Sequence, residues 1–471
     1  MIAPRIDAEP CTAAEADAAI AALQHREGMS FGVDAGVPGI HPLQAAVCVR
    51  PALRLRLWQD GLEAQGITAS GRALLASPAM SAWLASTGRG KGREPLDLAR
   101  AFLGCFEPSP DTLLLGALPF QAYRLGTTLV SKRGLYDGLP FDSDAPIGTL
   151  WFPECFLRRD ADGRWSSVTL ALPGAGSPAP ADHGPAPQAP EPPTGDDHGP
   201  GAYAGMVERA VAVLKSRPLV SLTLSQSYRR EVDMTAAEGF TRLRGFNPAP
   251  ASFFVNDGSG LRLFGASPDL QLVVRGREVA SIPVCGTVAR RPGPAGEAES
   301  IRELLANAVD AAALAVCSQA MREDLEPLCE PGSLRVTDRQ RPMALATVVH
   351  ALDRVEGRLR ADADAWDCIA ATGAPVMVTG TPRLLALQAI AELEASPRGW
   401  YGGLMVQVAA NGDALAGTIL RAAAVRGRVA EVRTGGDLLA DSDPAHEEEE
   451  SRLKTRSLWR AFGLDAQGHR P

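Results

Sequence analysis

The sequence predicts a mixed α/β, or α+β, protein. Short β-rich runs such as ASFFV, LRLFGAS and LQLVV are broken by Gly, Asp and Asn turns in the second half of the chain. Ala- and Leu-rich stretches typical of helices separate groups of these runs. No GxGxxG follows a strand, which disfavours a parallel nucleotide-binding sheet. Strands in groups with helices between them indicate sheets covered by helices.

The elements of the second half follow from periodicity and turn residues. Residues 207–214 place Val207, Val211 and Leu214 on one helical face, and LVSLTLSQSY then reads as a strand. Arg275-Gly276 is expected to turn a hairpin, and 297–324 to form a long helix. A last helix is expected from Asp443-Pro444 to about Phe462. Further helices are expected at DAWDCIAAT and PRLLALQAIAELEA, and strands at WYGGLMVQVA, AGTILRAAAV and VAEVRTGG.

One segment interrupts this pattern and divides the chain. Residues 173–201 are dominated by Pro, Ala and Gly and carry no hydrophobic periodicity. Such a composition buries too little apolar surface to order itself, so we expect a linker or loop there. The segment separates an N-terminal part, 1–172, from a C-terminal part, 202–471.

Composition excludes several classes of function. The net charge of -8 and the low aromatic content, 5%, argue against a nucleic-acid partner. No stretch approaches the roughly 20 apolar residues that span a bilayer, and the acidic N-terminus is unlike a signal peptide, so we expect no membrane. The eight cysteines form no CxxC and no zinc spacing, which fits reduced thiols in the cytoplasm.

Several short stretches, taken in order, resemble the family of chorismate-utilising enzymes. They are LFGASPDL, IPVCGTVAR, LCEPGSLRV, VVHALDRVEGRLR, VTGTPR, PRGWYGGL, ILRAAAV and LLADSDPAHEEEESRLK, and they span nearly all of 203–465. The resemblance is strongest to anthranilate synthase component I and to the large chain of 2-amino-2-deoxyisochorismate synthase. It implies an anthranilate synthase component I-like fold, with two β-sheets packed face to face and helices outside. Residues 1–172 resemble the family's N-terminal region only faintly.

The resemblance also implies a reaction. In the family, Mg²⁺ holds the ring carboxylate of chorismate while ammonia adds at C2 and the C4 hydroxyl departs; anthranilate synthases then eliminate pyruvate. No glutaminase sequence is recognised in this chain, so a separate glutamine amidotransferase subunit is the expected partner. We expect Mg²⁺ as cofactor, with Glu447, Glu450 and Asp310 as its ligands. From the residues alone, a run of glutamates early in a helix would equally complement the helix dipole.

Five positions match the family's contacts to the substrate carboxylates. Lys454 would contact a carboxylate, although it could also simply pair with Glu450 one turn earlier. An arginine and a tyrosine match the clamp on the enolpyruvyl carboxylate, and two glycines match backbone amides that face a carboxylate. As isolated residues, the arginine would be a surface residue and the glycines a turn. These positions are Tyr401, Arg421, Gly435 and Gly436, with Lys454.

The remaining candidates match positions around the ring. Gly286 and Thr287 would contact the ring, and Thr379 would lie in the loop over the substrate. His350 would act beside the ring carboxylate and in the elimination step, although a lone histidine in an apolar stretch is more often a core residue. Gln226 occupies the position where water-using members, the isochorismate and salicylate synthases, carry a lysine. Because glutamine cannot take a proton from water, the resemblance favours nitrogen as the nucleophile.

Four positions depart from the family pattern. Ala313 stands where the family has a second metal-binding acid next to Asp310, and VDxxRND reads SQAMRED. The proton donor to the departing hydroxyl, a glutamate in the family, is Asp269, and the GGxxG strand reads GGLMV. Two interpretations remain open: a diverged synthase, for example of specialised metabolism, or a catalytically silent paralogue that binds a chorismate-like ligand or a partner.

Overall fold

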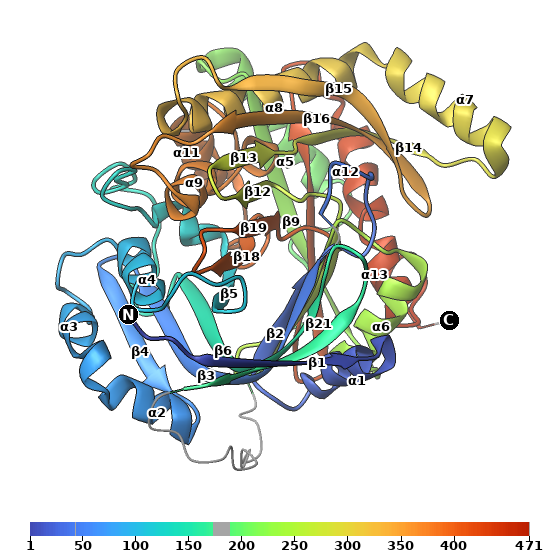
Figure 1. Ribbon diagram of the computed structural model, residues 1–471. Helices are drawn as coiled ribbons and strands as arrows, with labels where there is room; N and C mark the ends of the chain where they lie inside the picture. The colour runs from blue at the N-terminus through green and yellow to red at the C-terminus, as the bar shows by residue number, and fades with distance from the viewer. Residues whose placement is uncertain (43, 173–188, 471) are drawn as a thin grey trace.

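The computed structural model describes residues 1–42, 44–172 and 189–470. Within these ranges, 21 strands join in one hydrogen-bonded network (Figure 1). Its base is the antiparallel pair of β3 (Ala45–Trp58) and β6 (Gly148–Arg159). At the edges of this base lie β4 (Gly61–Gly66), β7 (Trp165–Ala171) and β1 (Arg5–Cys11).

Two arms extend from this base within the described residues. The first arm continues from β3 and ends on β9, with every neighbour antiparallel. Its order is β2 (Gly28–Gly32), β10 (Ala251–Asn256), β11 (Leu261–Ser267), β20 (Ala422–Arg426), β21 (Val429–Leu438) and β9 (Ser221–Glu231), to which β8 (Gly195–Asp196) and β17 (Gly380–Thr381) add short pairings.

The second arm starts from β6 and ends on β16, which pairs with strands on both sides. Its order is β5 (Leu113–Leu118), β18 (Leu404–Ala409), β19 (Ala414–Thr418), β12 (Leu272–Arg275), β13 (Glu278–Ser281) and β16 (Val348–Arg358), flanked by β14 (Val284–Ala289) and β15 (Arg335–Ala344). The hairpin expected at Arg275-Gly276 is confirmed as the turn between β12 and β13.

A hydrophobic core lies between the two arms. Phe31 and Phe253 of the first arm share one buried cluster with Met405 and Leu415 of the second and with Trp151 of the base. Burying such large apolar side chains stabilises the fold by roughly 2–3 kcal/mol each. The expected mixed α/β fold is therefore confirmed, and its two layers are continuous arms of one curled sheet.

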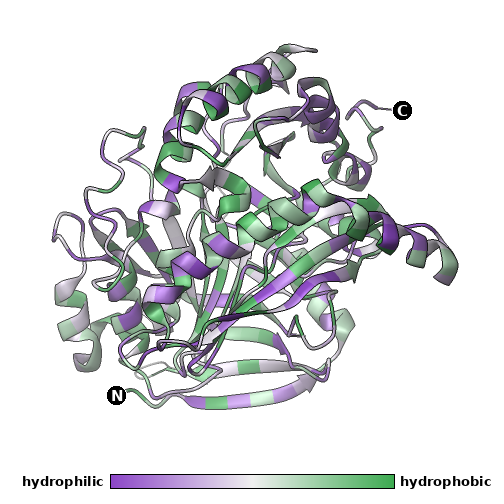
Figure 2. Cartoon of the chain, turned by 90° about the horizontal axis from the view of Figure 1, so that it is seen from above, coloured by the Kyte–Doolittle hydropathy of each residue, from purple (hydrophilic) through white to green (hydrophobic). Residues whose placement is uncertain are grey.

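Helices cover the sheet on the outside, and α7 projects furthest from the body (Figure 1). Figure 2 shows apolar colour along the central strands and many polar segments in the peripheral loops and helices. The helices of the described chain are α1 (Ala13–Ala22), α2 (Ala69–Ala76), α3 (Pro78–Ser86), α4 (Pro95–Leu103), α5 (Ala202–Ser216), α6 (Ala236–Phe246), α7 (Gly293–Ala306), α8 (Ala308–Leu325), α9 (Ala365–Thr372), α10 (Val376–Thr379), α11 (Arg383–Leu393), α12 (Pro444–Leu453) and α13 (Arg456–Ala461), with short 3₁₀ turns at Phe120–Arg124 and Glu326–Leu328.

Two expected helices are each divided. The helix expected over 297–324 is two helices, because Asn307 caps α8 by accepting hydrogen bonds from the backbone N–H groups of Val309 and Asp310. This cap places Asp310 in the first turn of α8. The last helix is likewise interrupted after Lys454 and resumes as α13.

Residues 173–188 of the expected linker lie outside the described residues. Its described remainder, 189–201, includes β8, and Asp197 there forms an ion pair of 2.9 Å with Arg229 of β9. Strands of 1–172 pair directly with strands of 202–471, as β2 does with β10. In the described ranges no single helix is long and apolar enough to cross a membrane; α7 and the following helical segment 308–328, bent by 70°, reach that length and composition only as a pair.

Candidate functional site

The first group of candidate residues lies where β14 and β16 pair. Thr287 stands opposite His350 in the register, and a β-bulge beside it accommodates Gly286 at φ +76°. The Nδ1 atom of His350 lies 3.0 Å from the carbonyl oxygen of Gly286 and 3.1 Å from Thr287 Oγ1. Because a carbonyl can only accept, Nδ1 carries the proton, and Nε2 is left with a free lone pair. Burial lowers the pKa of His350 to about 4, so the ring is neutral at physiological pH.

Asp310 reaches this group from the start of α8. A side-chain carbon added at Gly286 would lie 3.0 Å from Asp310 Oδ2, so only glycine leaves room for the carboxylate. Burial, together with the negative charge of Glu450, raises the pKa of Asp310. Ala313, one turn further along α8, is half-buried and brings no ligand atom. The structure thus joins Asp310 to the glycine and histidine group and leaves the neighbouring position apolar.

The helix α12 supplies the second group and lies against the end of β21. Lys454 Nζ donates to the carbonyl oxygen of Gly435 at 2.8 Å and forms an ion pair of 2.9 Å with Glu450 Oε1. Burial raises the pKa of Glu450, but Lys454 outweighs it, so the pKa lies below the ordinary value. Glu447 is buried, and its Oε2 points at Gly436, where a side-chain carbon would collide with it.

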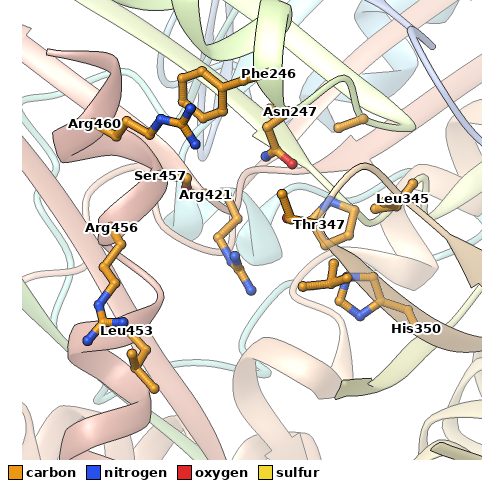
Figure 3. A pocket seen from close by; sticks show the side chains of 14 residues that line it. Phe246, Asn247, Leu345, Thr347, His350, Arg421, Leu453, Arg456, Ser457 and Arg460 are labelled. Atoms are coloured by element: carbon orange, nitrogen blue, oxygen red, sulfur yellow. The ribbon is translucent and has the colours of Figure 1, made fainter. Parts of the chain in front are cut away.

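Arg421 and Tyr401 influence each other electrostatically, although Tyr401 lines a neighbouring cavity. Arg421 has φ +47°, a left-handed conformation that costs a non-glycine residue on the order of 1 kcal/mol. Its carbonyl accepts from Ala266 N at 3.2 Å, and its side chain lines one cavity with His350 (Figure 3). Burial raises the pKa of Tyr401 to about 12, so the phenol stays protonated. Burial lowers the pKa of Arg421, and the negative charge of Glu450 opposes this shift.

Gln226 lies beneath α12 on β9. It is fully buried, stands opposite Thr434 of β21, and its Nε2 donates to Tyr228 Oη at 2.7 Å. Tyr228 in turn contacts Ser451 of α12 at 3.0 Å. Gln226 Oε1 is buried and has no hydrogen-bond partner among the described residues. The amide can therefore accept a hydrogen bond there without taking up a proton.

Asp269 lies in the segment that crosses from β11 to β12. Its carboxyl is buried and accepts a hydrogen bond from Thr418 through Oδ2, whereas Oδ1 has no partner in the described ranges. Burial raises the pKa of Asp269 to about 7, so about half of the molecules carry the proton at neutral pH. The preceding residue, Pro268, lines the cavity shared by His350 and Arg421.

Two sequence expectations connect less well with this site. The hydroxyl of Thr379 is buried and donates to the carbonyl oxygen of Pro375 at 2.9 Å, and none of its hydrogen bonds within the described residues reaches another candidate. Val406, the bulky end of GGLMV, packs in a hydrophobic core cluster and does not line the cavity.

Sequence reasoning missed Asp437, which directly follows the two glycines of β21. Burial raises its pKa to about 7, and the charge of Glu447 acts in the same direction. Thr223 Oγ1 lies 3.2 Å from its Oδ1. An acid in an otherwise apolar strand end was visible in VRTGGDLL, but only the structure shows that it is half-buried and within reach of the charge of Glu447 on α12.

The acids of this site suit a hard divalent cation in their chemistry. Within the described residues no group of three or more His, Cys, Asp or Glu already stands in metal-binding geometry. Glu447 nevertheless has a buried oxygen without a partner, and the pKa values of Glu447 and Asp310 are raised, chiefly by burial and then by Glu450. Mg²⁺ needs few carboxylates because it keeps several waters. The residues therefore fit such an ion, with one donor fewer than the family pattern.

A site that gathers acids, a lysine, an arginine and a neutral histidine at the meeting point of two sheet arms is suited to a small anionic compound. A family model described as chorismate binding enzyme matches residues 109–460. The chain therefore belongs to the chorismate-binding enzyme family.

Individual relatives agree with this assignment. The chain is 39% identical over 277 residues to an anthranilate synthase of Azospirillum brasilense, an alignment that covers 59% of this chain and 38% of that protein. It is 32% identical over 256 residues to anthranilate synthase component 1 of Streptomyces coelicolor, covering 54% and 50% of the two chains. The chain thus aligns with half or less of the length of these relatives.

Solved structures share the fold at low identity. The isochorismate synthase MenF of Escherichia coli superposes with a TM-score of 0.71 and 18% identity, covering 98% of this chain and 94% of that one. Anthranilate synthase component I of Streptococcus pneumoniae gives a TM-score of 0.68 and 20% identity, with 90% and 92% covered. These structural similarities establish the fold, whereas the reaction has to be inferred from the residues of the site.

Proposed function

We propose that this protein aminates chorismate at C2 with loss of the C4 hydroxyl, using ammonia from a separate glutaminase subunit. The product would be anthranilate or the non-aromatised 2-amino-2-deoxyisochorismate. The observation that carries the proposal is that Lys454 is paired with Glu450, whose charge acts on both Asp310 and Arg421, and that Arg421 lines one cavity with His350. It offers cationic partners for two carboxylates on either side of a neutral base.

Binding would rest on charge and backbone. Lys454 and the amides of Gly435 and Gly436 would bind the ring carboxylate, and the Arg421 guanidinium, with the Tyr401 phenol, would bind the enolpyruvyl carboxylate. The contact of Lys454 with the Gly435 carbonyl oxygen and the cavity that Arg421 lines support these roles. Mg²⁺, when bound by Glu447, Glu450 and Asp310, would supply the positive charge that holds and polarises the ring carboxylate. The fixed donors would orient the ring before reaction.

Two residues could move the protons. Asp269, half protonated near neutrality, could give its proton to the departing C4 hydroxyl, so that the C4–O bond breaks as the nitrogen bonds to C2 and the ring double bonds shift. His350 Nε2 could accept the C2 proton when enolpyruvate leaves C3, which yields pyruvate and the aromatic ring. Neither step requires Gln226 to act as a base. Because water would need such a base and ammonia does not, a glutamine at this position favours ammonia as the nucleophile.

The test is incubation of the purified chain with chorismate, Mg²⁺ and ammonium, followed by mass spectrometry. An aminated product supports the synthase, and its mass separates anthranilate from the non-aromatised amine. A product isomeric with chorismate would support water addition instead. Chorismate that stays unchanged, with and without a glutaminase, would contradict the proposal and favour a silent paralogue.

Ala313 is the specific observation that favours this second candidate. Without the second acid on α8, metal binding would be weakened, since even changes outside the ligand set typically cost about 10–100-fold. A silent paralogue would still bind chorismate or a similar dianion through Lys454 and Arg421.

The eight free cysteines suit a cytoplasmic protein, and that location stays a prediction.

A further inference from the structure

The cavity that His350 and Arg421 share extends away from the acids of the candidate site. It measures about 280 Å³ and lies between α13, the end of α6 and the strand β16 (Figure 3). Two more arginines line it, Arg456 and Arg460, one turn apart on α13. Among the described residues that line it there is no Asp and no Glu, so the cavity collects three guanidinium groups and no carboxylate.

These arginines are not neutralised by neighbours in the described part of the chain. The side chain of Arg456 forms no ion pair or hydrogen bond there, and that of Arg460 rests on the ring of Phe246 with 4.4 Å to the centroid. Elsewhere the buried Arg433 is paired with Glu394 at 2.8 Å. Both residues are exposed, so water and salt screen the repulsion between these like charges one helical turn apart, and both guanidinium groups are accessible to an anion from solution.

The other residues that line the cavity indicate the chemical character of such an anion. Phe246, Leu345, Val348 and Leu453 present apolar surface, and Asn247 adds one polar amide. A cavity with several cations on one wall and apolar side chains on another suits a compact ring compound that bears a carboxylate. In Figure 3 the side chain of Arg421 extends into the open space beside His350, and Arg456 and Arg460 lie on the helical wall across from it.

We propose that Arg456 and Arg460 form a capture subsite for an anionic ring compound, which passes from it to Arg421 and the candidate site. The inference rests on the proposed function in taking chorismate as that compound. The two arginines contact the substrate before it reaches the reacting position, so they would govern the rate of productive capture and leave the chemical step unchanged. Clefts lined by one sign of charge raise association rates by roughly 10- to 1,000-fold, and salt suppresses this gain.

The kinetic test compares the double variant R456Q/R460Q with R93Q. Arg93 is exposed in the loop before α4, far along the chain from the cavity, and serves as a control for loss of surface charge. We expect kcat/KM for chorismate at low ionic strength to fall about tenfold in the double variant, with kcat unchanged and a flatter dependence on salt. R93Q should keep the kinetics and salt dependence of the parent. Two results would overturn the inference. One is a double variant in which kcat falls and kcat/KM is reduced as much at high salt as at low salt. The other is a fall of kcat/KM in R93Q as large as that in the double variant.

A second measurement separates this inference from the proposed reaction. Calorimetric titration with chorismate, without ammonium and Mg²⁺, reports binding when no turnover is possible. Weaker binding in R456Q/R460Q than in R93Q supports the capture subsite even if the parent protein proves unable to aminate chorismate. Identical affinity in all three proteins, each confirmed as folded by its melting temperature, refutes the subsite whatever the activity.

Discussion

The variant Asp269→Asn tests whether the pKa of the Asp269 carboxyl is raised, and it does so by measuring the stability of the protein at two pH values. The carboxyl of Asp269 is 1% exposed, and its pKa is raised from 3.8 to about 7 because burial disfavours the charge. A raised pKa means that the folded state binds the proton more tightly than the unfolded state. The protein is therefore fully stable, in this respect, below pH 4 and loses stability as the pH rises towards and through 7.

The size of the effect follows from the shift. About three pKa units at 1.36 kcal/mol each give an upper bound of about 4 kcal/mol, of which about 2.7 kcal/mol develops between pH 5 and pH 8.5. At about 2.1 cal/mol/K per residue, unfolding 471 residues has an entropy of about 1 kcal/mol/K. The asparagine side chain of the variant cannot ionise, so the melting temperature of the variant relative to the parent should be about 3 °C higher at pH 8.5 than at pH 5.

The assay is differential scanning calorimetry of both proteins at the two pH values. Asp137→Asn, at an exposed position, is the matched control and should show no such difference between the two pH values. An Asp269→Asn shift that is the same at both pH values would mean that the folded carboxyl is already ionised at pH 5, and the reasoning about its burial would be refuted. Activity gives an independent readout: under the proposed role of Asp269 as proton donor, the variant should lose turnover, whereas chorismate binding should survive the replacement.

Three further changes address the metal and carboxylate contacts. Gly436→Ala would push the flexible end of Glu447 aside, so the Mg²⁺ concentration for half-maximal activity should rise about tenfold with little change in melting temperature, whereas Gly435→Ala meets a backbone carbonyl of β9 and should lower the melting temperature instead. Ala313→Glu should lower the required Mg²⁺ concentration about tenfold in a metal titration; no response would mean that α8 does not face the ion. Lys454→Met removes a charge-assisted contact of about 1.5–3 kcal/mol, so KM for chorismate should rise about 10–100-fold with unchanged secondary structure by circular dichroism.

Much of the fold could be predicted because local patterns decide it. The hairpin at Arg275-Gly276 follows from a turn dipeptide between two β-rich runs, and the pairing of β12 with β13 confirms it. The breaks in the two long helices were not predicted. Asn307 is a modest helix residue that becomes a stop only because its side chain caps α8, and nothing in EEEESRLKTRSLW marks the turn after Lys454.

Motif resemblance supplied the candidate site residues, and the structure adds neighbours that belong to no motif. Asp437 and Arg456 belong to no motif, and their environment depends on strand register and on the angle at which α13 leaves α12. Burial of a carboxyl and the absence of acids near an arginine are properties of three-dimensional packing. Thr379 shows the converse: it fits the motif, yet its hydroxyl is used by the backbone of its own helix.

The charge balance of the site explains what Ala313 changes. Asp310, Glu447 and Glu450 oppose Lys454 and Arg421, so three carboxylates face two cations. A glutamate at 313 would make the surplus two, equal and opposite to Mg²⁺, whereas alanine leaves a surplus of one. At about 6 Å and an effective dielectric constant of about 20, one added charge attracts a divalent ion by about 5 kcal/mol. Desolvation of the added carboxylate offsets most of this energy, which leaves the roughly tenfold gain in affinity expected in the metal titration.

That difference acts in opposite directions on the two ligands. With alanine at 313, Mg²⁺ would be held less tightly, and a dianion would meet less repulsion before any metal binds. A variant with glutamate should therefore bind Mg²⁺ more tightly and metal-free chorismate more weakly. If both affinities move together, the acids do not share one space with the substrate, and the departure at 313 would have to be explained by packing of α8 alone.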